Sequence, residues 1–194
     1  MAKVDYHLVI RPHTKDAECG DTGVIKEFDT KVFMGIIDVL GHSKEAHKTA
    51  IISKDYLEKN YRKNLVEMMM GLHECILRTK GAVAGLCHLD LKAGELKYVG
   101  IGNITARRFG SSTTKIICRS GVIGYIMPTP REETIKLCHD DVLVLYTDGV
   151  KEHFKLEDYP ELLRDNAKTI ATHIIHKFGK KEDDAACIAL RHKR

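Results

Sequence analysis

Apolar and polar positions alternate or cluster in ways that predict several β-strands in the first part of the chain. Residues 3–11 alternate apolar and polar side chains, which is typical of a half-buried strand. A polar loop and a further strand near 22–28 are expected next. The apolar run 32–37 then predicts a buried strand that ends on the carboxylate of Asp38.

Two helices are expected after this strand. Ser43 is an acceptable N-cap with Glu45 in the opening turn, so we predict that the first helix begins near Ser43 and ends near Tyr61. The second helix carries apolar residues at helical spacing over 65–76. Its run of three methionines fits core packing better than an adaptable binding surface.

Strand patterns dominate again from residue 82. Three pairs of apolar segments are each separated by three to five turn-forming or polar residues. Such connections are too short for a crossover, so we expect antiparallel hairpins. The expected pairs are 82–91 with 95–100, 104–109 with 115–119, and 134–138 with 142–147.

The chain then predicts one more helix and one more strand. The helix is expected over about 160–177, opened by Asp158 and Pro160, and the strand over 185–190. Strands, two helices, many strands, one helix and one strand follow one another in this order. That order favours a layered α+β sandwich, and no linker interrupts it, so residues 1–194 are expected to form one domain.

Composition agrees with a globular protein and excludes some functions. Of 194 residues, 43% are apolar and 30% charged, and the formal net charge is only +4. The basic residues are scattered, without the basic stripe and interleaved aromatics of a nucleic-acid-binding surface. No apolar run approaches the roughly 20 residues that span a bilayer, so we expect neither a nucleic acid nor a membrane as partner.

The cysteines indicate a reducing compartment. There are six, and no two of them form a C-x-x-C pair. Most lie among apolar residues, where a free cysteine packs as a small apolar side chain. The N-terminus lacks the apolar stretch of a signal peptide, so the expected location is cytoplasmic and the cysteines are expected to be thiols.

Aspartates at the ends of apolar strands are the candidate chemistry. Asp38 ends one strand, Asp148 ends the strand over 142–147, Asp183 and Asp184 precede the last strand, and Asp21 lies near an early one. Gathered carboxylates repel one another unless a divalent cation neutralises them. Carboxylate oxygen suits Mg²⁺ or Mn²⁺, and two such ions can activate a water for attack on phosphorus.

These motifs resemble a known family. Gly20-Asp21, Asp38-x-x-Gly-His, Tyr-Thr-Asp148-Gly-Val and Asp183-Asp-Ala, in this order, look like the metal-dependent PPM (PP2C-like) serine/threonine phosphatases of the SpoIIE type. The match covers nearly the whole chain. The small size, with no sensor domain attached, is most similar to the phosphatases of the bacterial stressosome.

The resemblance implies a set of metal ligands and a fold. Asp38 would bridge two Mn²⁺ or Mg²⁺ ions, Asp148 and Asp183 would complete one site, and Asp21 with the Val39 carbonyl would complete the other. The implied fold is an α+β four-layer αββα sandwich of two antiparallel β-sheets flanked by helices. The family has glycine where this chain has Val39, and valine would be strained if that position required a positive φ.

Other residues keep two interpretations open. His42 is a candidate general acid for the leaving alkoxide, or a structural histidine at the helix start. Asp184 is a further candidate ligand or a turn residue, and Asn103 points into the site or forms a turn. Arg11 and Arg107 are conceivable phosphate clamps, but no residue is assigned to substrate binding.

The predicted function is hydrolysis of phosphoserine or phosphothreonine on a phosphorylated stressosome-type scaffold or STAS-domain partner. The resemblance implies attack by a metal-bridging water, with no side chain as nucleophile. The alternative is a catalytically weak module of the same fold that binds and sequesters a signalling partner, as the departures at Val39 and Leu40 suggest. A nucleic-acid-binding protein is a third, weaker candidate.

Overall fold

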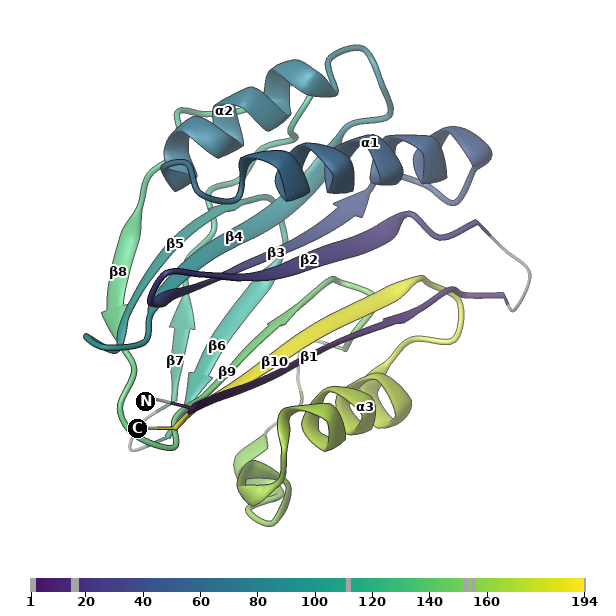
Figure 1. Cartoon of the computed structure of the whole chain (residues 1–194). Helices are drawn as coiled ribbons and strands as arrows, with labels where there is room; N and C mark the ends of the chain where they lie inside the picture. The colour runs from purple at the N-terminus through teal and green to yellow at the C-terminus, as the bar shows by residue number, and fades with distance from the viewer. Residues whose placement is uncertain (1–2, 15–17, 111–112, 152–153, 155, 194) are drawn as a thin grey trace.

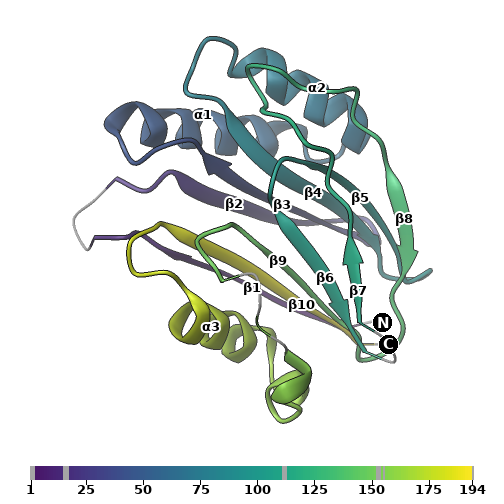
Figure 2. The same cartoon turned by 180° about the vertical axis from the view of Figure 1, so that it is seen from behind.

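The chain folds into four layers, with two antiparallel β-sheets packed face to face between helices (Figure 1). The computed structural model describes residues 3–14, 18–110, 113–151, 154 and 156–193. Helices α1 and α2 cover the outer face of one sheet, and α3 covers the outer face of the other, as Figure 2 shows from behind. The expected αββα sandwich is confirmed.

The first sheet has the strand order β2-β3-β4-β5-β8. Strands β2, β3 and β4 pair along their whole lengths, and Asp21 of β2 lies opposite Asp38 of β3. Residues of β3 are almost all buried because both faces are covered, one by helices and one by the second sheet. The strands are β2 Asp21–Phe28, β3 Lys31–Val39, β4 Ala82–Asp90, β5 Glu95–Ile101 and β8 Glu133–Lys136.

The second sheet has the strand order β1-β10-β9-β6-β7 and joins the two ends of the sequence. The last strand, β10, inserts between the first strand and β9, and Lys3 pairs with Lys193. The termini therefore lie together at one end of the sandwich (Figure 1). The strands are β1 Lys3–Arg11, β6 Thr105–Phe109, β7 Thr114–Ile116, β9 Val142–Tyr146 and β10 Ala185–Lys193.

The helices begin at side-chain caps. Ser43 caps α1 (Lys44–Asn60) through a hydrogen bond from the Ala46 amide, as predicted. Asn64 caps α2 (Leu65–Cys75), and its side chain accepts from two amides of the first turn. Asn166 caps α3 (Ala167–Phe178) through a hydrogen bond from the Thr169 amide.

Three apolar layers hold the sandwich together. One fills the space between α1, α2 and the first sheet, and includes Phe33, Leu57 and Met68. The second lies between the two sheets, and the third lies between the second sheet and α3. No helix among the described residues is long and apolar enough to cross a membrane.

Two of the predicted elements are wrong. Residues 134–138 and 142–147 do not form a hairpin, because β8 pairs with β5 in the first sheet and β9 joins the second sheet. The chain crosses between the sheets here, held by hydrogen bonds from Leu137 N to Gly94 O and from Asp140 N to His192 O. The last helix begins at Ala167 rather than near 160, since 3-10 turns occupy Leu156–Asp158 and Leu162–Arg164.

Candidate metal centre

Both sheets deliver aspartates to the end of the sandwich that lies opposite the termini. Asp21 begins β2 and faces Asp38, the penultimate residue of β3, across the first sheet. Asp148 follows β9, and Asp183 precedes β10, so both belong to the second sheet. The four aspartates that the sequence predicts are therefore brought to one edge, two from each sheet.

The two aspartates of the first sheet are destabilised as anions. Burial raises the pKa of Asp38 to about 7, and the neighbouring charges of Asp148 and Asp183 add to the shift. Burial also raises the pKa of Asp21 well above its usual value, with a further contribution from Asp38. Desolvation and like charge act in the same direction, which is the condition that a bound cation relieves.

Asp21 is held by a buried threonine. The Thr147 hydroxyl donates to Asp21 Oδ2 at 2.7 Å and accepts from the Ala186 amide at 2.9 Å. Thr147 is fully buried and precedes Asp148 at the end of β9. This hydroxyl therefore ties the first residue of β2, in one sheet, to β9 and β10 in the other.

The loops that carry Asp148 and Asp183 touch through a glycine. A Cβ added to Gly149 would lie 1.7 Å from the Asp184 carbonyl oxygen, a distance that no side chain tolerates. Glycine after Asp148 is thus what lets the two acidic loops approach each other. On its other side, the Asp148 carboxylate accepts from the Asn103 amide at 2.8 Å, so Asn103 points into the site.

Arg11 clamps the loop that carries Asp183. Its guanidinium donates to the carbonyl oxygens of Lys180 and Asp183, the latter at 3.2 Å, and to that of Ile175 at 3.5 Å. These bonds use the guanidinium for the backbone rather than for a substrate phosphate. Arg107 is also engaged elsewhere, since it donates to the Phe154 carbonyl at 2.8 Å.

Asp184 has surroundings that differ from those of the other acids. Its carboxylate accepts from the backbone amides of Gly20 and His13, each at 2.8 Å, and both imidazoles, of His13 and His42, face it. Burial opposes the charge, but these hydrogen bonds outweigh it and lower the pKa of Asp184. Asp184 organises the loops around the site, and its direct ligation of the Mn²⁺ or Mg²⁺ pair stays a prediction.

The backbone at Val39 is unstrained. Val39 is the last residue of β3 and does not have a positive φ, which falls instead at Gly41, with φ of +88°. Its amide donates to the Gly20 carbonyl at 3.2 Å, and a Cβ on Gly20 would come within 3.0 Å of the Val39 carbonyl oxygen. Valine thus fits here, and glycine at position 20 leaves room beside the carbonyl that we predict as a ligand.

These residues fit a site for hard divalent cations. Carboxylates converge on it, three of them with raised pKa values, and among the described residues no lysine or arginine forms an ion pair with any of the four aspartates. A second group of ligand atoms lies beside these aspartates: in the described part of the chain, one atom each of His13, His42 and Asp184 lies within 4.8 Å of the others. Several carboxylates gathered at one edge suit ligands shared between two ions.

The sequence does not predict two residues of this site, Thr147 and His13, and leaves Arg11 only as a conceivable phosphate clamp. Thr147 stands directly before Asp148, so a hydroxyl beside a predicted ligand was the available signal. His13 carried none, because its partner Asp184 is distant in sequence. Arg11 was considered for the substrate phosphate, although its position at the end of β1, opposite Ala185, is what directs it to the last loop.

A cavity of about 430 Å³ opens beside the acidic edge. Asp148 and Asn103 lie on its wall, and Ile117, which is 70% exposed, lies on its rim. The cavity offers space for a substrate segment next to the aspartates.

The SpoIIE sequence family (Stage II sporulation protein E) matches residues 29–193. The chain belongs to the SpoIIE family. It is therefore a metal-dependent protein serine/threonine phosphatase of the PP2C type. No curated protein matches it in sequence.

Several solved structures share the fold. A chain from work on the bacterial stressosome as a modular system adapted to control secondary messenger signalling is 25% identical, with a TM-score of 0.90 over 97% of this chain and 100% of that one. RsbX in complex with magnesium is 15% identical, with a TM-score of 0.86 over 100% of both chains. The PP2C domain of SpoIIE from Bacillus subtilis, solved with a regulatory fragment, is 18% identical, with a TM-score of 0.78 over 97% of this chain and 63% of that one.

Proposed function

We propose that this SpoIIE-family chain removes phosphate from serine or threonine of a stressosome-type scaffold or STAS-domain protein. The observation that carries the proposal is the convergence of Asp21, Asp38, Asp148 and Asp183 from two sheets on one edge. The similarity to a chain from work on the stressosome and to RsbX supports the choice of partner. Residues 1–194 are proposed to form one phosphatase domain.

Two divalent cations are proposed, Mn²⁺ or Mg²⁺, with Asp38 as the shared ligand. Asp148 and Asp183 would hold one ion, and Asp21 with the Val39 carbonyl would hold the other. When bound, such a pair supplies a water of lowered pKa and neutralises charge on the phosphate. No side chain of the protein is needed as nucleophile.

The remaining residues of the site hold this arrangement and receive the substrate. Thr147 and Asn103 fix the carboxylates of Asp21 and Asp148 by hydrogen bonds. The Nε2 atom of His42 lies 3.5 Å from Asp183 Oδ1 at the exposed side of the site, where it can give a proton to the leaving alkoxide. The cavity beside Asp148 takes the chain that flanks the phosphorylated residue.

The test is hydrolysis of a phosphoserine peptide and of a phosphorylated STAS-domain protein with added Mn²⁺. Asp38→Asn and Asp148→Asn are each expected to lower turnover by more than about 100-fold, since even outer partners of metal ligands are worth about 10- to 100-fold. Asp29→Asn is the matched control. It makes the same chemical change in the β2–β3 turn, where Asp29 has φ of +50° and its side chain is 72% exposed.

The results of this assay distinguish a phosphatase from a module that only binds its partner. Equal turnover in Asp38→Asn and the wild type would overturn the roles given to the aspartates. Tight binding of the phosphorylated partner with no Mn²⁺-dependent turnover would instead favour the sequestering module. Because Val39 is unstrained, its departure from the family pattern gives that alternative no structural support.

A further inference from the structure

Two histidines converge on one carboxylate beside the aspartate centre. His13 lies just after β1, His42 lies just before α1, and Asp184 lies just before β10. One ligand atom from each of the three lies within 4.8 Å of the others. The three residues come from both sheets and from distant parts of the sequence.

The spacing of these atoms suits a metal ion with nitrogen ligands. His13 Nδ1 is 3.2 Å from Asp184 Oδ1, and His42 Nδ1 is 3.4 Å from Asp184 Oδ2. Ligands about 2.0 to 2.1 Å from a tetrahedral ion lie roughly 3.3 to 3.4 Å apart, which is close to the distance of each histidine nitrogen from its nearest Asp184 oxygen. The two rings, with centroids 4.8 Å apart and planes 48° to each other, are neighbours without being stacked.

The surroundings hold the three side chains in place. Asp184 is 3% exposed, and the Gly20 and His13 amides fix one oxygen each, which leaves lone pairs on both oxygens. His42 has Asp183 on its far side, with Nε2 3.5 Å from the carboxylate. A carboxylate behind the second nitrogen of a ligating histidine is the usual support of such a ligand.

The chemistry differs from that of the neighbouring aspartates. Carboxylate and carbonyl oxygens select Mg²⁺ or Mn²⁺, whereas imidazole nitrogens favour zinc and related transition-metal ions. We propose that His13, His42 and Asp184 form a separate site for a nitrogen-preferring divalent cation of the zinc class, with water in the fourth position. Asp183 belongs to both sites, as an outer partner of His42 in one and as an oxygen ligand in the other.

The proposal has a functional consequence. An ion that holds His42 by Nδ1 fixes the imidazole against Asp184 and removes it from proton transfer to the leaving group. It also ties the segment after β1 to the start of β10. A zinc-class ion is therefore expected to inhibit the phosphatase while it stabilises the fold.

Cobalt is a suitable probe because tetrahedral Co²⁺ absorbs visible light far more strongly than octahedral Co²⁺. Co²⁺ is titrated into the protein in excess Mg²⁺, which occupies the oxygen site. We expect an intense visible band that saturates at one Co²⁺ per chain. Zn²⁺ should remove this band stoichiometrically, and further Mg²⁺ should leave it unchanged.

Three variants decide between this site and a plain hydrogen-bonded network. His13→Asn, which keeps the backbone bond to Asp184, should weaken Co²⁺ binding by at least about 10-fold. His139→Asn is the matched control: His139 Nδ1 lies 3.0 Å from the Asp140 carboxylate, away from the proposed site, so its replacement should leave the band intact. Asp148→Asn should also keep the band, since it alters only the oxygen site.

The contrary outcomes are equally clear. No intense band, or a band of equal affinity in His13→Asn, would overturn the proposal. A band lost in Asp148→Asn would place the cobalt among the aspartates and overturn it as well. Thermal unfolding of His13→Asn and of a second variant, His13→Gln, checks that both fold, and the phosphatase assay is not needed for any of these results.

Discussion

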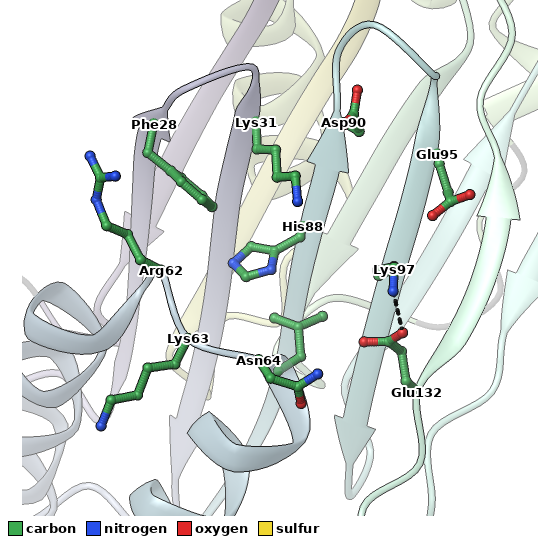
Figure 3. Close-up of a pocket in the computed structure, with 11 residues that line it drawn as sticks. Phe28, Lys31, Arg62, Lys63, Asn64, His88, Asp90, Glu95, Lys97 and Glu132 are labelled. Carbon is green, nitrogen blue, oxygen red and sulfur yellow. Dashed lines mark hydrogen bonds and ion pairs between the residues drawn. The ribbon is translucent and has the colours of Figure 1, made fainter.

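The two ends of the first sheet treat charge in opposite ways. The first residue of β3, Lys31, lines a cavity of about 260 Å³, and Asp38 near the other end of the strand lies in the acidic centre. At the cavity end, Figure 3 shows lysines and acids together, and the Lys97 ammonium pairs with Glu132 at 2.9 Å. At the other end, burial and the neighbouring carboxylates of Asp148 and Asp183 raise the pKa of Asp38.

A histidine and an aspartate sharpen the contrast. At the cavity, the His88 Nε2–H donates to the Tyr61 carbonyl oxygen at 2.7 Å, and burial lowers the pKa of His88, which favours the neutral ring. At the acidic end, Asp38 is buried beside other acids and its pKa rises to about 7. At the cavity end, basic side chains of the protein neutralise the acidic ones. At the acidic end, the carboxylates need a bound cation to neutralise them. That difference separates an ordinary polar surface cavity from a metal centre.

The strongest way to break the contrast is Asp38→Asn. In metal-free protein the change removes a charge that burial and its neighbours oppose, so the free energy of unfolding should rise by about 1 to 2 kcal/mol. Added Mn²⁺ should then give far less stabilisation than in the wild type, because the shared ligand is gone. Urea unfolding with and without Mn²⁺ measures both effects. A less stable metal-free variant would contradict the description of Asp38 as a repelled anion.

A smaller loss is expected from Thr147→Val. The methyl group keeps the shape but leaves the buried Asp21 carboxylate without its hydroxyl donor. We expect Mn²⁺ affinity to fall by about 10- to 100-fold, measured by calorimetric titration. Thr147→Ser, which keeps the hydroxyl, is the control and should bind nearly as the wild type does. Equal affinity in the valine variant would show that Asp21 needs no support.

The pH dependence of stability tests the same difference without a mutation. The pKa of Asp38 is about 7 in the folded state and 3.8 for an ordinary aspartate, so between these pH values the folded state holds a proton that the unfolded state has released. Stability should therefore fall as pH rises from about 4 to 7, by at most about 1.4 kcal/mol per pH unit for this group. Saturating Mn²⁺ should offset the loss at the upper end of the window. Chemical denaturation at several pH values measures how the free energy of unfolding changes with pH. A metal-free protein whose stability rises between pH 4 and 7 would contradict the prediction.

The smallest effect is expected at the balanced end. Lys97 and Glu132 form a partly exposed pair, so Lys97→Met should change stability by less than about 1 kcal/mol and leave turnover unchanged. The same assays with Glu132→Gln complete the comparison. A large loss of Mn²⁺-dependent turnover in either variant would show that the two ends are not independent.

Local patterns predicted most elements because each carried its own signal. The Ser43 cap, the buried run of β3 and the short turn between β4 and β5 depend on neighbours in sequence, and the structure confirms all three. The acids followed from the same reasoning, since a strand delivers its last residue to the edge of a sheet.

Predictions failed where distant contacts decide. A strand, a short turn and another strand read locally as a hairpin, but Gly94 and His192 direct β8 and β9 into different sheets. Asp158 and Pro160 are helix-start signals, yet α3 begins only after the Asn166 cap. There the Ala167 amide also donates to the Asp5 carboxylate of β1. The meeting of His13 with Asp184 depends on the same kind of long-range pairing, which local pattern does not contain.

The place of β10 in the second sheet sets the order in which the protein becomes competent during synthesis. Asp21 and Asp38 leave the ribosome early, but β1 has no partner in its sheet until β10 arrives between it and β9. Asp183 is made just before that strand. A nascent chain can thus complete its helices and first sheet while the metal centre is still half built, so activity appears only after the final strand has paired.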